Sequence, residues 1–240
     1  MQVVLLRVGI DTGSGGIHGP LFRDGSFEYI PIPDCFRGTG VDERTYGNTR
    51  GRNGPRLIEY FPEARQERLL DQRVHFDPEF ETFTCGDPTS PKTSLRRLSE
   101  GSLLVFYAGL KGWDFECAPA LYIIGYFKVA RAGLAMSFTQ SELRGLFHNN
   151  FHVMHRAVFA NQKDRLVLIK GNQNSRLLKK AVKISSLATD KSGRPLQKLA
   201  PVMEKTFGDF DGHTSIQRSP PRWVAPEFTD RSAEFISGLR

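Results

Sequence analysis

The sequence predicts an α+β fold with a mixed, strand-dominated central sheet, peripheral helices and long loops. Two runs rich in Val, Ile, Phe and Tyr, Ser102–Ala108 and Leu121–Val129, predict adjacent strands. A third apolar run, Gln2–Val8, is nearly continuous, which is typical of a strand buried on both faces. Helix signals are confined to short stretches outside these runs, so strands should dominate the middle of the chain.

Size and composition suit one domain spanning residues 1–240. Of the 240 residues, 39% are hydrophobic and 25% are charged, which is enough apolar material for a sizeable core. No apolar run approaches the roughly 18 residues of a membrane helix, and the N-terminal run lacks the features of a signal peptide. The odd, widely spaced set of cysteines, Cys35, Cys85 and Cys117, does not suit a disulfide framework. We therefore expect a cytoplasmic protein with free thiols and no membrane partner.

Short strands and long loops are predicted for the first third of the chain. The Asp24-Gly25 pair is a hairpin-turn signal, and Phe27–Ile32 alternates before prolines, as a short edge strand does. The polar segment Asp42–Pro55, rich in Arg, Gly and Asn, predicts a long surface loop. Loops of this length are uncommon unless they are functional or mobile. A second loop is predicted at Pro78–Pro91.

The remainder of the chain alternates strands and short helices. A further strand is predicted at Leu166–Lys170, and a proline-rich arm at Arg218–Pro226 carries Trp223. Thr139 or Ser141, followed by Glu142, supplies the cap of one helix. The predicted helices and helical turns are Ser94–Leu98, Ser137–His152, Ser175–Val182 and Asp230–Ile236.

A glycine-rich loop follows the first strand and carries the first candidate chemistry. Glycines allow backbone N–H groups to approach an anion closely, and Thr12 and Ser14 add hydroxyl donors. The predicted anion-binding residues are Thr12, Gly13, Ser14, Gly15 and Gly16. Asp11 and His18 are candidate acid–base residues. The spacing matches neither a Walker A motif nor a Rossmann fingerprint, and a plain glycine turn between two strands is the alternative.

An acidic and aromatic block, His75 to Pro88, carries the second group of candidate catalytic and binding residues. His75, Asp77 and Asp87 are candidate catalytic residues, and Phe80 is a candidate for stacking on a base. His75 and Asp77, two residues apart on an extended segment, could also bind a divalent cation. Alternatively, the Asp-Pro steps initiate turns and the phenylalanines fill the core. We assign no metal site and no cofactor from the sequence.

Histidines and basic residues complete the candidate set. His148, His152 and His155 fall on one face of the predicted helix, where a hydrogen-bonding role for His152 is favoured over a metal site because no carboxylate lies among them. The formal net charge is +7, from 33 Lys and Arg against 26 Asp and Glu. Much of the excess lies in Lys163–Lys183, where Lys170 and Arg176 are candidate substrate-binding residues. A solvated basic face is the alternative.

Several of these stretches resemble one known family. The run LLRVGIDTGSGGIHGPLFRDGSFEYIPIPD (Leu5–Asp34) is similar to the opening of the nucleotide modification associated domain, third type. The stretches HFDPEFETFTCGDP, GSLLVFYAGL, LYIIGYFKV and LVLIKGNQNSRLLKKA are similar to its later blocks. The resemblance implies a link to modified nucleotides in bacterial and phage systems, and it implies no established reaction. The strand pattern of the middle of the chain also resembles PUA-like barrels such as the EVE and ASCH domains, by analogy only.

Three functions stay open at this point. The first is a protein that binds or modifies bases in DNA or RNA through the glycine-rich loop and the acidic-aromatic block, with a nucleotide or nucleic acid as partner. The second is a non-catalytic, PUA-like reader of modified or single-stranded nucleic acid, with aromatic residues such as Tyr107 stacking on bases. The third is an α+β protein with a small anionic ligand or a protein partner. Whether the chain is an enzyme is therefore left undecided.

Overall fold

Two long antiparallel strands form the centre of the molecule, β6 (Leu103–Gly112) and β7 (Ala120–Leu134). The computed structural model describes residues 1–12, 17–36, 43–217 and 220–240. Both strands are almost continuously buried from Leu103 to Leu110 and from Ala120 to Phe127. The two strands predicted from β-branched and aromatic residues are therefore confirmed. Such side chains pack well on the pleated surface of a sheet that is covered by other parts of the chain.

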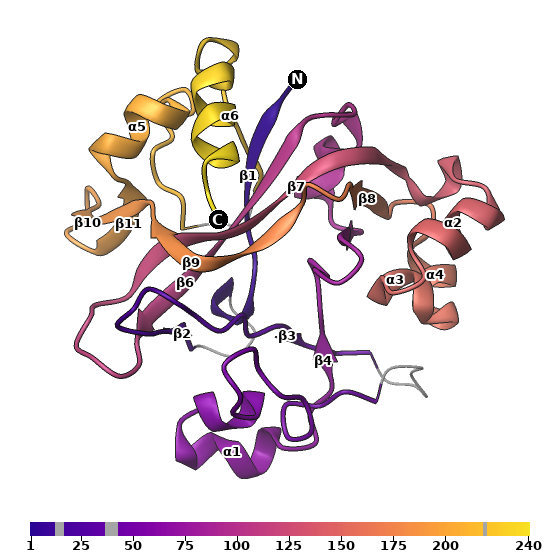
Figure 1. Cartoon of the computed structure of the whole chain (residues 1–240), viewed down its shortest axis with the longest axis horizontal. Coiled ribbons are helices and arrows are strands. Elements are labelled where there is room, and N and C mark those ends of the chain that lie inside the picture. The colour runs from indigo at the N-terminus through magenta and orange to yellow at the C-terminus, as the bar shows by residue number, and fades with distance from the viewer. Residues whose placement is uncertain (13–16, 37–42, 218–219) are drawn as a thin grey trace.

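Strands on both sides extend this pair into a mixed sheet (Figure 1). The order is β12-β1-β6-β7-β8-β5, with β2 also paired to β6 and β9 also paired to β7. The bounds of these strands are β1 Val3–Arg7, β2 Gly19–Leu21, β5 Thr84–Asp87, β8 Val167–Gly171, β9 Arg176–Lys183 and β12 Arg222–Trp223. Strands β1 and β2 run parallel to β6, and the other pairs are antiparallel. Among the described strands, β12 and β5 end the sheet without pairing to each other, so the mixed sheet is formed and the PUA-like barrel is not.

Strand β9 corrects the helical turn predicted at Ser175–Val182. Leu, Lys and Ala favour helices in isolation, but here Leu177 pairs with Gly125 and Val182 pairs with Ile123 of β7. Because β8 pairs with the second half of β7 and β9 with the first half, the two strands continue one another along the same edge. Tertiary pairing therefore outweighs local propensity.

The helices are short and lie around the sheet (Figure 1). The α-helices are α1 Glu63–Leu69, α2 Gln140–Leu146, α3 Phe151–Met154, α4 Arg156–Gln162, α5 Pro201–Phe207 and α6 Thr229–Ser237. The 3₁₀ helices are Ile10–Thr12, Leu57–Tyr60, Ser90–Arg97, Ala135–Ser137 and Pro226–Phe228. Two further two-stranded sheets pair β3 (Ile32–Pro33) with β4 (Val74–His75), and β10 (Ser185–Thr189) with β11 (Pro195–Leu199). No helix of the described residues is long and apolar enough to span a membrane.

The helix predicted at Ser137–His152 is divided into separate turns. Thr139 caps α2 as predicted, because its side chain accepts from the N–H of Glu142 in a capping box. The chain leaves the helix at Phe147, and Asn150 begins α3 by accepting a hydrogen bond from the N–H of His152. An asparagine side chain favours a cap over a helix interior, so the three histidines do not form a single helical stripe.

Two other local predictions are displaced. The edge strand predicted at Phe27–Ile32 is reduced to a bridge between Leu21 and Phe27 and to the two-residue strand β3. The turn before it is confirmed, since Gly25 has a φ of +87° and the N–H of Phe22 donates to the Ser26 carbonyl. The short helix near residue 94 begins four residues earlier, because Pro91 occupies its first turn.

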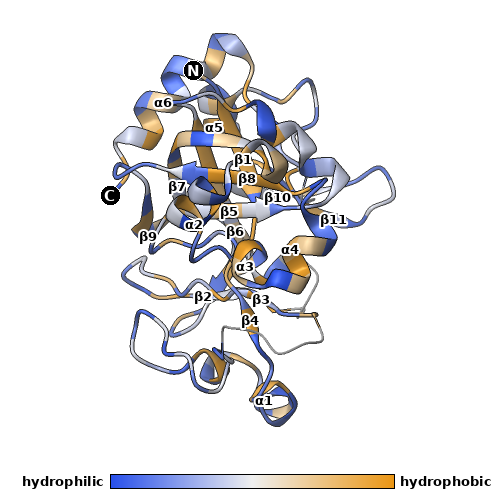
Figure 2. Cartoon of the chain, turned by 90° about the vertical axis from the view of Figure 1, so that its right-hand side faces the viewer, coloured by the Kyte–Doolittle hydropathy of each residue, from blue (hydrophilic) through white to orange (hydrophobic). Residues whose placement is uncertain are grey.

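Apolar side chains gather into three clusters, and hydrophobic residues follow the central strands (Figure 2). The largest cluster surrounds β1, β6 and β7. A second lies under the loop of residues 43–62 and includes Tyr46, Leu57 and Ile58. The third joins α2 and Phe147 to β8. The second cluster holds the Arg-rich loop against the body of the chain, which positions the cavity described below.

Candidate functional site

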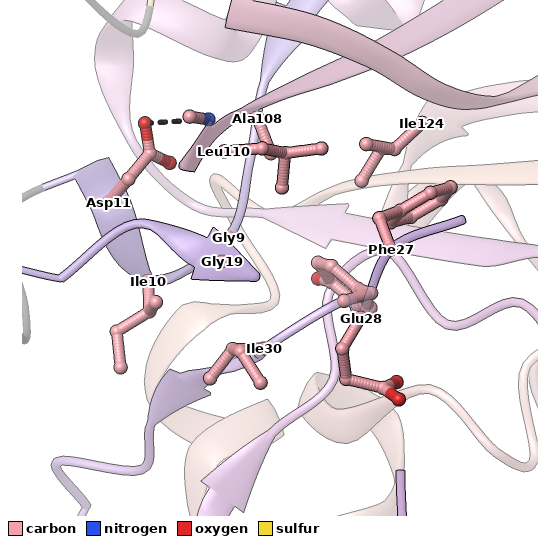
Figure 3. A pocket seen from close by; sticks show the side chains of 12 residues that line it. Gly9, Ile10, Asp11, Gly19, Phe27, Glu28, Ile30, Ala108, Leu110 and Ile124 are labelled. Atoms are coloured by element: carbon pink, nitrogen blue, oxygen red, sulfur yellow. Dashed lines mark hydrogen bonds between the residues drawn. The ribbon is translucent and has the colours of Figure 1, made fainter. Parts of the chain in front are cut away.

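The glycine-rich loop leaves the sheet between two strands that share one edge. Arg7, at the end of β1, is opposite Tyr107 of β6, and Gly19, at the start of β2, is opposite Leu110. The intervening chain therefore leaves and rejoins the sheet at positions three residues apart on β6. The carboxylate of Asp11 fills this gap, because its Oδ2 accepts a hydrogen bond of 2.9 Å from the N–H of Gly109 (Figure 3).

Asp11 and Arg7 form a buried ion pair in this loop. Their side chains are 2% and 11% exposed, and Arg7 Nε lies 3.0 Å from Asp11 Oδ2. Burial raises the pKa of Asp11, and the charge and hydrogen bond of Arg7 offset only part of that rise. The site also excludes any side chain at position 109, because a Cβ there would lie 2.3 Å from Asp11 Oδ2. The loop is thus held by Asp11 as a structural element.

The pocket at this loop is too small for a nucleotide. Gly9, Ile10, Asp11 and Gly19 line it, together with Phe27 and Glu28 (Figure 3). Its volume is about 10 Å³, which is room for about one water molecule. Of the predicted anion-binding residues, Gly13, Ser14, Gly15 and Gly16 lie outside the described residues, as does the side chain of Thr12. The predicted phosphate cradle therefore stays a prediction.

His18 lies beside Asp11, since a Cβ at Gly109 would come close to both side chains. Burial lowers the pKa of His18, and Arg7 and Lys111 lower it further against the opposing effect of Asp11. The imidazole lines a separate hollow of about 350 Å³ together with Lys111 and Trp113. Asp11 and His18 are therefore neighbours, as their predicted acid–base roles require. Both lie next to β2.

A second group, the histidine cluster, consists of His75, Asp77 and His152. His75 ends β4 and Asp77 follows two residues later, while His152 comes from α3, far along the chain. One ligand atom from each lies within 4.8 Å of the other two. His152 Nε2 is 3.4 Å from Asp77 Oδ2. The structure thus brings together two predicted catalytic residues and one predicted substrate-binding residue.

The surroundings of the histidine cluster are buried and ordered by hydrogen bonds. His152 Nδ1 lies 2.7 Å from Gln162 Oε1, and Asp77 Oδ1 accepts a hydrogen bond of 3.0 Å from the N–H of Gly86. The His75 ring stacks on Phe151 at 3.7 Å between centroids. Burial lowers the pKa of His75 well below its ordinary value, and His152 adds to the effect. Two histidines and a carboxylate in this setting can hold a divalent cation.

Asp87, the fifth predicted catalytic residue, lies at the end of β5 in a different setting. Its carboxylate forms an ion pair with Lys92 and accepts a hydrogen bond of 2.7 Å from the N–H of Thr89. Burial lowers the pKa of Lys92, but Asp87 outweighs it and the net shift is upward. The five predicted catalytic residues therefore fall into two regions: Asp11 with His18, and His75 with Asp77, which the Asp87–Lys92 pair borders because Lys92 interacts electrostatically with both His75 and Asp77.

A third group of residues, the arginine cavity, encloses about 400 Å³. Its cationic wall comes from the loop of residues 43–55, and its apolar wall comes from the aromatic side chains that precede and follow Asp77. The lining includes Arg44, Arg50, Arg52, Tyr29, Phe76 and Phe80. A volume of this size falls in the range of small-ligand sites, which is about 300–1,000 Å³. Arginine beside aromatic rings is the combination that binds phosphate and stacks on bases.

Three acidic residues also line this cavity, Glu28, Glu79 and Glu81, and hydrogen bonds within the protein hold the first two. Glu28 accepts hydrogen bonds from the N–H and the side-chain amide of Asn53, at 3.1 and 3.2 Å. Glu79 accepts from the N–H of Thr82 at 2.8 Å. Both carboxylates are almost fully buried. Hydrogen bonds hold the carboxylates of Glu28 and Glu79 in place, and Glu81 is exposed, so the cavity presents three arginines together with three carboxylates.

The Arg-rich loop is anchored from both sides. The carbonyl of Arg44 accepts from the N–H of Val74 in β4, and the Arg44 guanidinium lies 4.5 Å from the centre of the Phe76 ring. Arg52 donates a hydrogen bond of 2.9 Å to the carbonyl of Leu178 in β9. The cavity therefore sits between β4 and β9.

The remaining predicted residues occupy varied positions. Phe80 lines the arginine cavity and makes edge contacts with Tyr29, at 5.8 Å between ring centres. Tyr107 is 0% exposed and donates a hydrogen bond of 2.9 Å to the Ile216 carbonyl, so it lies in the core of the sheet. Lys170 donates to the Thr82 carbonyl, and burial lowers its pKa. Arg176 is exposed on β9.

Sequence reasoning did not identify the arginines of the cavity, Tyr29 or Gln162. The signal for the arginines was present, because Asp42–Pro55 is a long polar loop rich in Arg and Gly. The sequence offers no such signal for Gln162, because its contact with His152 depends on α4 lying beside α3. Tyr29 belongs to an alternating segment that offers no mark of a site.

One family model matches the chain, over residues 2–237, and its description is nucleotide modification associated domain 3. No curated protein and no solved structure is significantly similar to the chain. The family match covers the whole of the central sheet, the glycine-rich loop, the histidine cluster and the arginine cavity.

Proposed function

Because the chain belongs to the nucleotide modification associated domain 3 family, we propose that it binds single-stranded nucleic acid and receives one nucleotide in the arginine cavity. The base stacks against Phe76 and Phe80, and the phosphate pairs with the arginines of the loop. The observation that carries this proposal is the joint presence, in about 400 Å³, of Arg44, Arg50 and Arg52 with two phenylalanine rings. The family description supports a nucleotide as the ligand in preference to another anion.

Strand β9 supplies the surface for the neighbouring phosphates. Leu177 lines the cavity, and Arg176, Lys179, Lys180 and Lys183 of the same strand are exposed. A row of cations beside a stacking pocket follows the backbone of a single strand without reading its sequence. These cations of β9 support the proposal as partners for the phosphates of a polyanion.

The proposal is one of binding, and the geometry favours it over chemistry in the cavity. Of the five predicted catalytic residues, Asp11, His18, His75, Asp77 and Asp87, none is among the residues that line the arginine cavity. His75 and Asp77 flank Phe76 along an extended segment, where successive side chains point to opposite sides. Phe76 therefore faces the cavity while its neighbours face the histidine cluster.

Replacing Phe76 by leucine should weaken the binding of a 12-nucleotide single-stranded DNA by roughly 5- to 150-fold. The reason is that one base–aromatic stacking contact contributes about 1–3 kcal/mol, whereas leucine keeps most of the apolar volume and costs less than about 1.5 kcal/mol in stability. Arg50→Ala should weaken binding about tenfold through the loss of a charge-assisted hydrogen bond. Fluorescence anisotropy of the labelled oligonucleotide measures both effects.

The matched control is Arg144→Ala, which removes an exposed arginine from α2, outside the arginine cavity. This variant should bind within about twofold of the unchanged chain. Equal losses in Arg50→Ala and Arg144→Ala would mean that only net charge matters, and the cavity would then not be the site.

Binding should also weaken steeply with salt. Each phosphate contact on a single strand contributes about 0.7 to the slope of log K against log salt concentration. The triple variant Lys179→Gln, Lys180→Gln, Lys183→Gln should therefore reduce the magnitude of that slope by about 2 between 50 and 200 mM salt. Lys191→Gln, in the exposed turn after β10, serves as the control and should leave the slope unchanged. A slope that the triple variant does not alter would exclude β9 as the backbone path.

A further inference from the structure

The geometry points to a second site: we propose that His75, Asp77 and His152 bind one divalent transition-metal ion, with Zn²⁺ as the reference ion. This inference does not depend on the proposed nucleotide binding, because it rests on different side chains. His75 and Asp77 belong to the histidine cluster, whereas Phe76 between them lines the arginine cavity. Two imidazole nitrogens and one carboxylate oxygen form a donor set that suits Zn²⁺, Fe²⁺ or Co²⁺. Mg²⁺ and Ca²⁺ prefer oxygen ligands.

The three ligand atoms are close enough to converge on an ion. They lie within 4.8 Å of one another, and ligand atoms about 2.0–2.1 Å from a tetrahedral zinc ion are roughly 3.4 Å apart. Contraction of the largest separation by at most about 1.4 Å is within reach of side-chain rotation. Three protein ligands leave a coordination position open, as in catalytic zinc sites.

The second ring nitrogen of His152 is held as a metal-binding histidine requires. Its Nδ1 lies 2.7 Å from Gln162 Oε1, so Nδ1–H donates to the amide oxygen and Nε2 keeps its lone pair. That Nε2 is the atom that faces Asp77 Oδ2, at 3.4 Å. An outer partner that fixes the tautomer and the ring orientation is typical of histidines that ligate metals.

Asp77 is oriented in a similar way. The N–H of Gly86 donates to Oδ1 at 3.0 Å, which leaves Oδ2 directed to the cluster. The approach of Gly86 is close, because a Cβ at that position would lie 2.8 Å from Cδ2 of His152. The thiol of Cys85 also hydrogen-bonds to Asp77, but it is not one of the three converging ligands.

The buried ring of His75 supplies an independent observation that points to a ligand. Its side chain is 7% exposed, and its Nε2 is buried without a hydrogen-bond partner among the described residues. A buried polar atom left unsatisfied costs about 1–3 kcal/mol. The Asp77–His152 pair does not relieve this cost, because it involves neither nitrogen of His75. A metal ion that takes all three side chains accounts for their convergence and for the placement of His75.

The test uses the full chain stripped with a chelator and then titrated with Co²⁺ and with Zn²⁺. The unchanged chain should bind one equivalent of each, with visible Co²⁺ absorption that Zn²⁺ abolishes by displacement. His75→Ala and Asp77→Asn should each lower the affinity at least tenfold, and Asp77→Asn keeps the hydrogen bond from Gly86 if His75→Ala fails to fold. Gln162→Leu should lower it by about 10- to 100-fold through loss of the outer partner.

His148→Ala is the matched control, because His148 is exposed between α2 and α3 and bonds only locally, to the Gly145 carbonyl. It should bind Co²⁺ as the unchanged chain does, and Mg²⁺ should not compete. Absence of a one-equivalent Co²⁺ or Zn²⁺ complex in the unchanged chain overturns the proposal. Equal affinity in Asp77→Asn, Gln162→Leu and His148→Ala overturns it as well. Failure of nucleotide binding alone would leave these measurements unaffected, so the two proposals fail separately.

Discussion

Replacement of Asp11 by alanine is expected to lower the free energy of unfolding by about 3–5 kcal/mol. The variant leaves Arg7, which is 11% exposed, as a buried charge without its carboxylate. It also removes the acceptor of the Gly109 N–H. The measurement is urea unfolding followed by circular dichroism, in which the midpoint should fall while the slope stays the same.

The pair itself contributes little compared with an apolar pair. Burial of Asp11 raises its pKa more than Arg7 lowers it, so the desolvation of the carboxylate outweighs the attraction. The double variant Arg7→Met, Asp11→Leu should therefore recover the part of the loss caused by the unpaired Arg7 charge, and the cost of the unsatisfied Gly109 N–H, about 1–3 kcal/mol, should remain. Glu59→Ala, which breaks the exposed pair with Arg56, should cost less than about 1 kcal/mol. A loss in Asp11→Ala no larger than in Glu59→Ala would contradict a structural role for Asp11.

Phe127→Ala should destabilise the chain by a comparable amount, about 3–5 kcal/mol. Phe127 is 0% exposed and contacts the rings of Phe80, Phe83 and Phe106, at 5.4, 6.0 and 4.6 Å between centres. Truncation to alanine leaves a cavity at this junction, where close-packed rings cannot all move to fill it. Thermal or urea unfolding measures the cost.

The same variant links the core to the arginine cavity. Because Phe80 rests against Phe127 and lines the cavity, the variant should also weaken oligonucleotide binding under conditions where it remains folded. Leu187→Ala is the control, since Leu187 is 71% exposed, and its effect on stability should stay within about 0.5 kcal/mol. Unchanged binding in folded Phe127→Ala would show that the position of Phe80 is unimportant for the ligand.

The sheet could largely be predicted from the sequence, because its strands are marked by their own residues. The strand predicted at Ser102–Ala108 corresponds to β6, and the one predicted at Leu121–Val129 corresponds to β7. Each predicted strand begins within one residue of the observed strand, and Gln2–Val8 predicts β1. These side chains need a covered, pleated surface wherever they occur in the chain. Strand β9 could not be predicted, because Leu, Lys and Ala adopt the strand only through pairing with β7.

The candidate site was predictable only where it is local. His75 and Asp77 lie two residues apart on an extended segment, so their shared orientation follows from the period of a strand. The arrival of His152 beside them depends on the break at Asn150, which turns the helix and starts α3. The arginine cavity depends on β4 and β9 meeting the loop of residues 43–55, which are contacts between distant parts of the chain.

The arginine cavity and the histidine cluster lie on different faces of one segment, residues 75–77. Phe76 lines the arginine cavity, and its neighbours belong to the histidine cluster. Tyr29 contacts both regions, since it lines the cavity and since Asp77 adds to the rise that burial causes in its pKa. Its hydroxyl is buried beside the backbone N–H of Asp77, between the two regions.

Ultraviolet cross-linking of a single-stranded oligonucleotide that carries one 5-iodouracil tests the central claim most directly. Mass spectrometry of the digested complex would identify the side chain in contact with the base. The account predicts adducts on Phe76, Phe80 or Tyr29, which line the arginine cavity, and their loss in Arg50→Ala at the same oligonucleotide concentration. Adducts confined to aromatic residues outside the cavity, such as Trp113, which is 49% exposed, would contradict it.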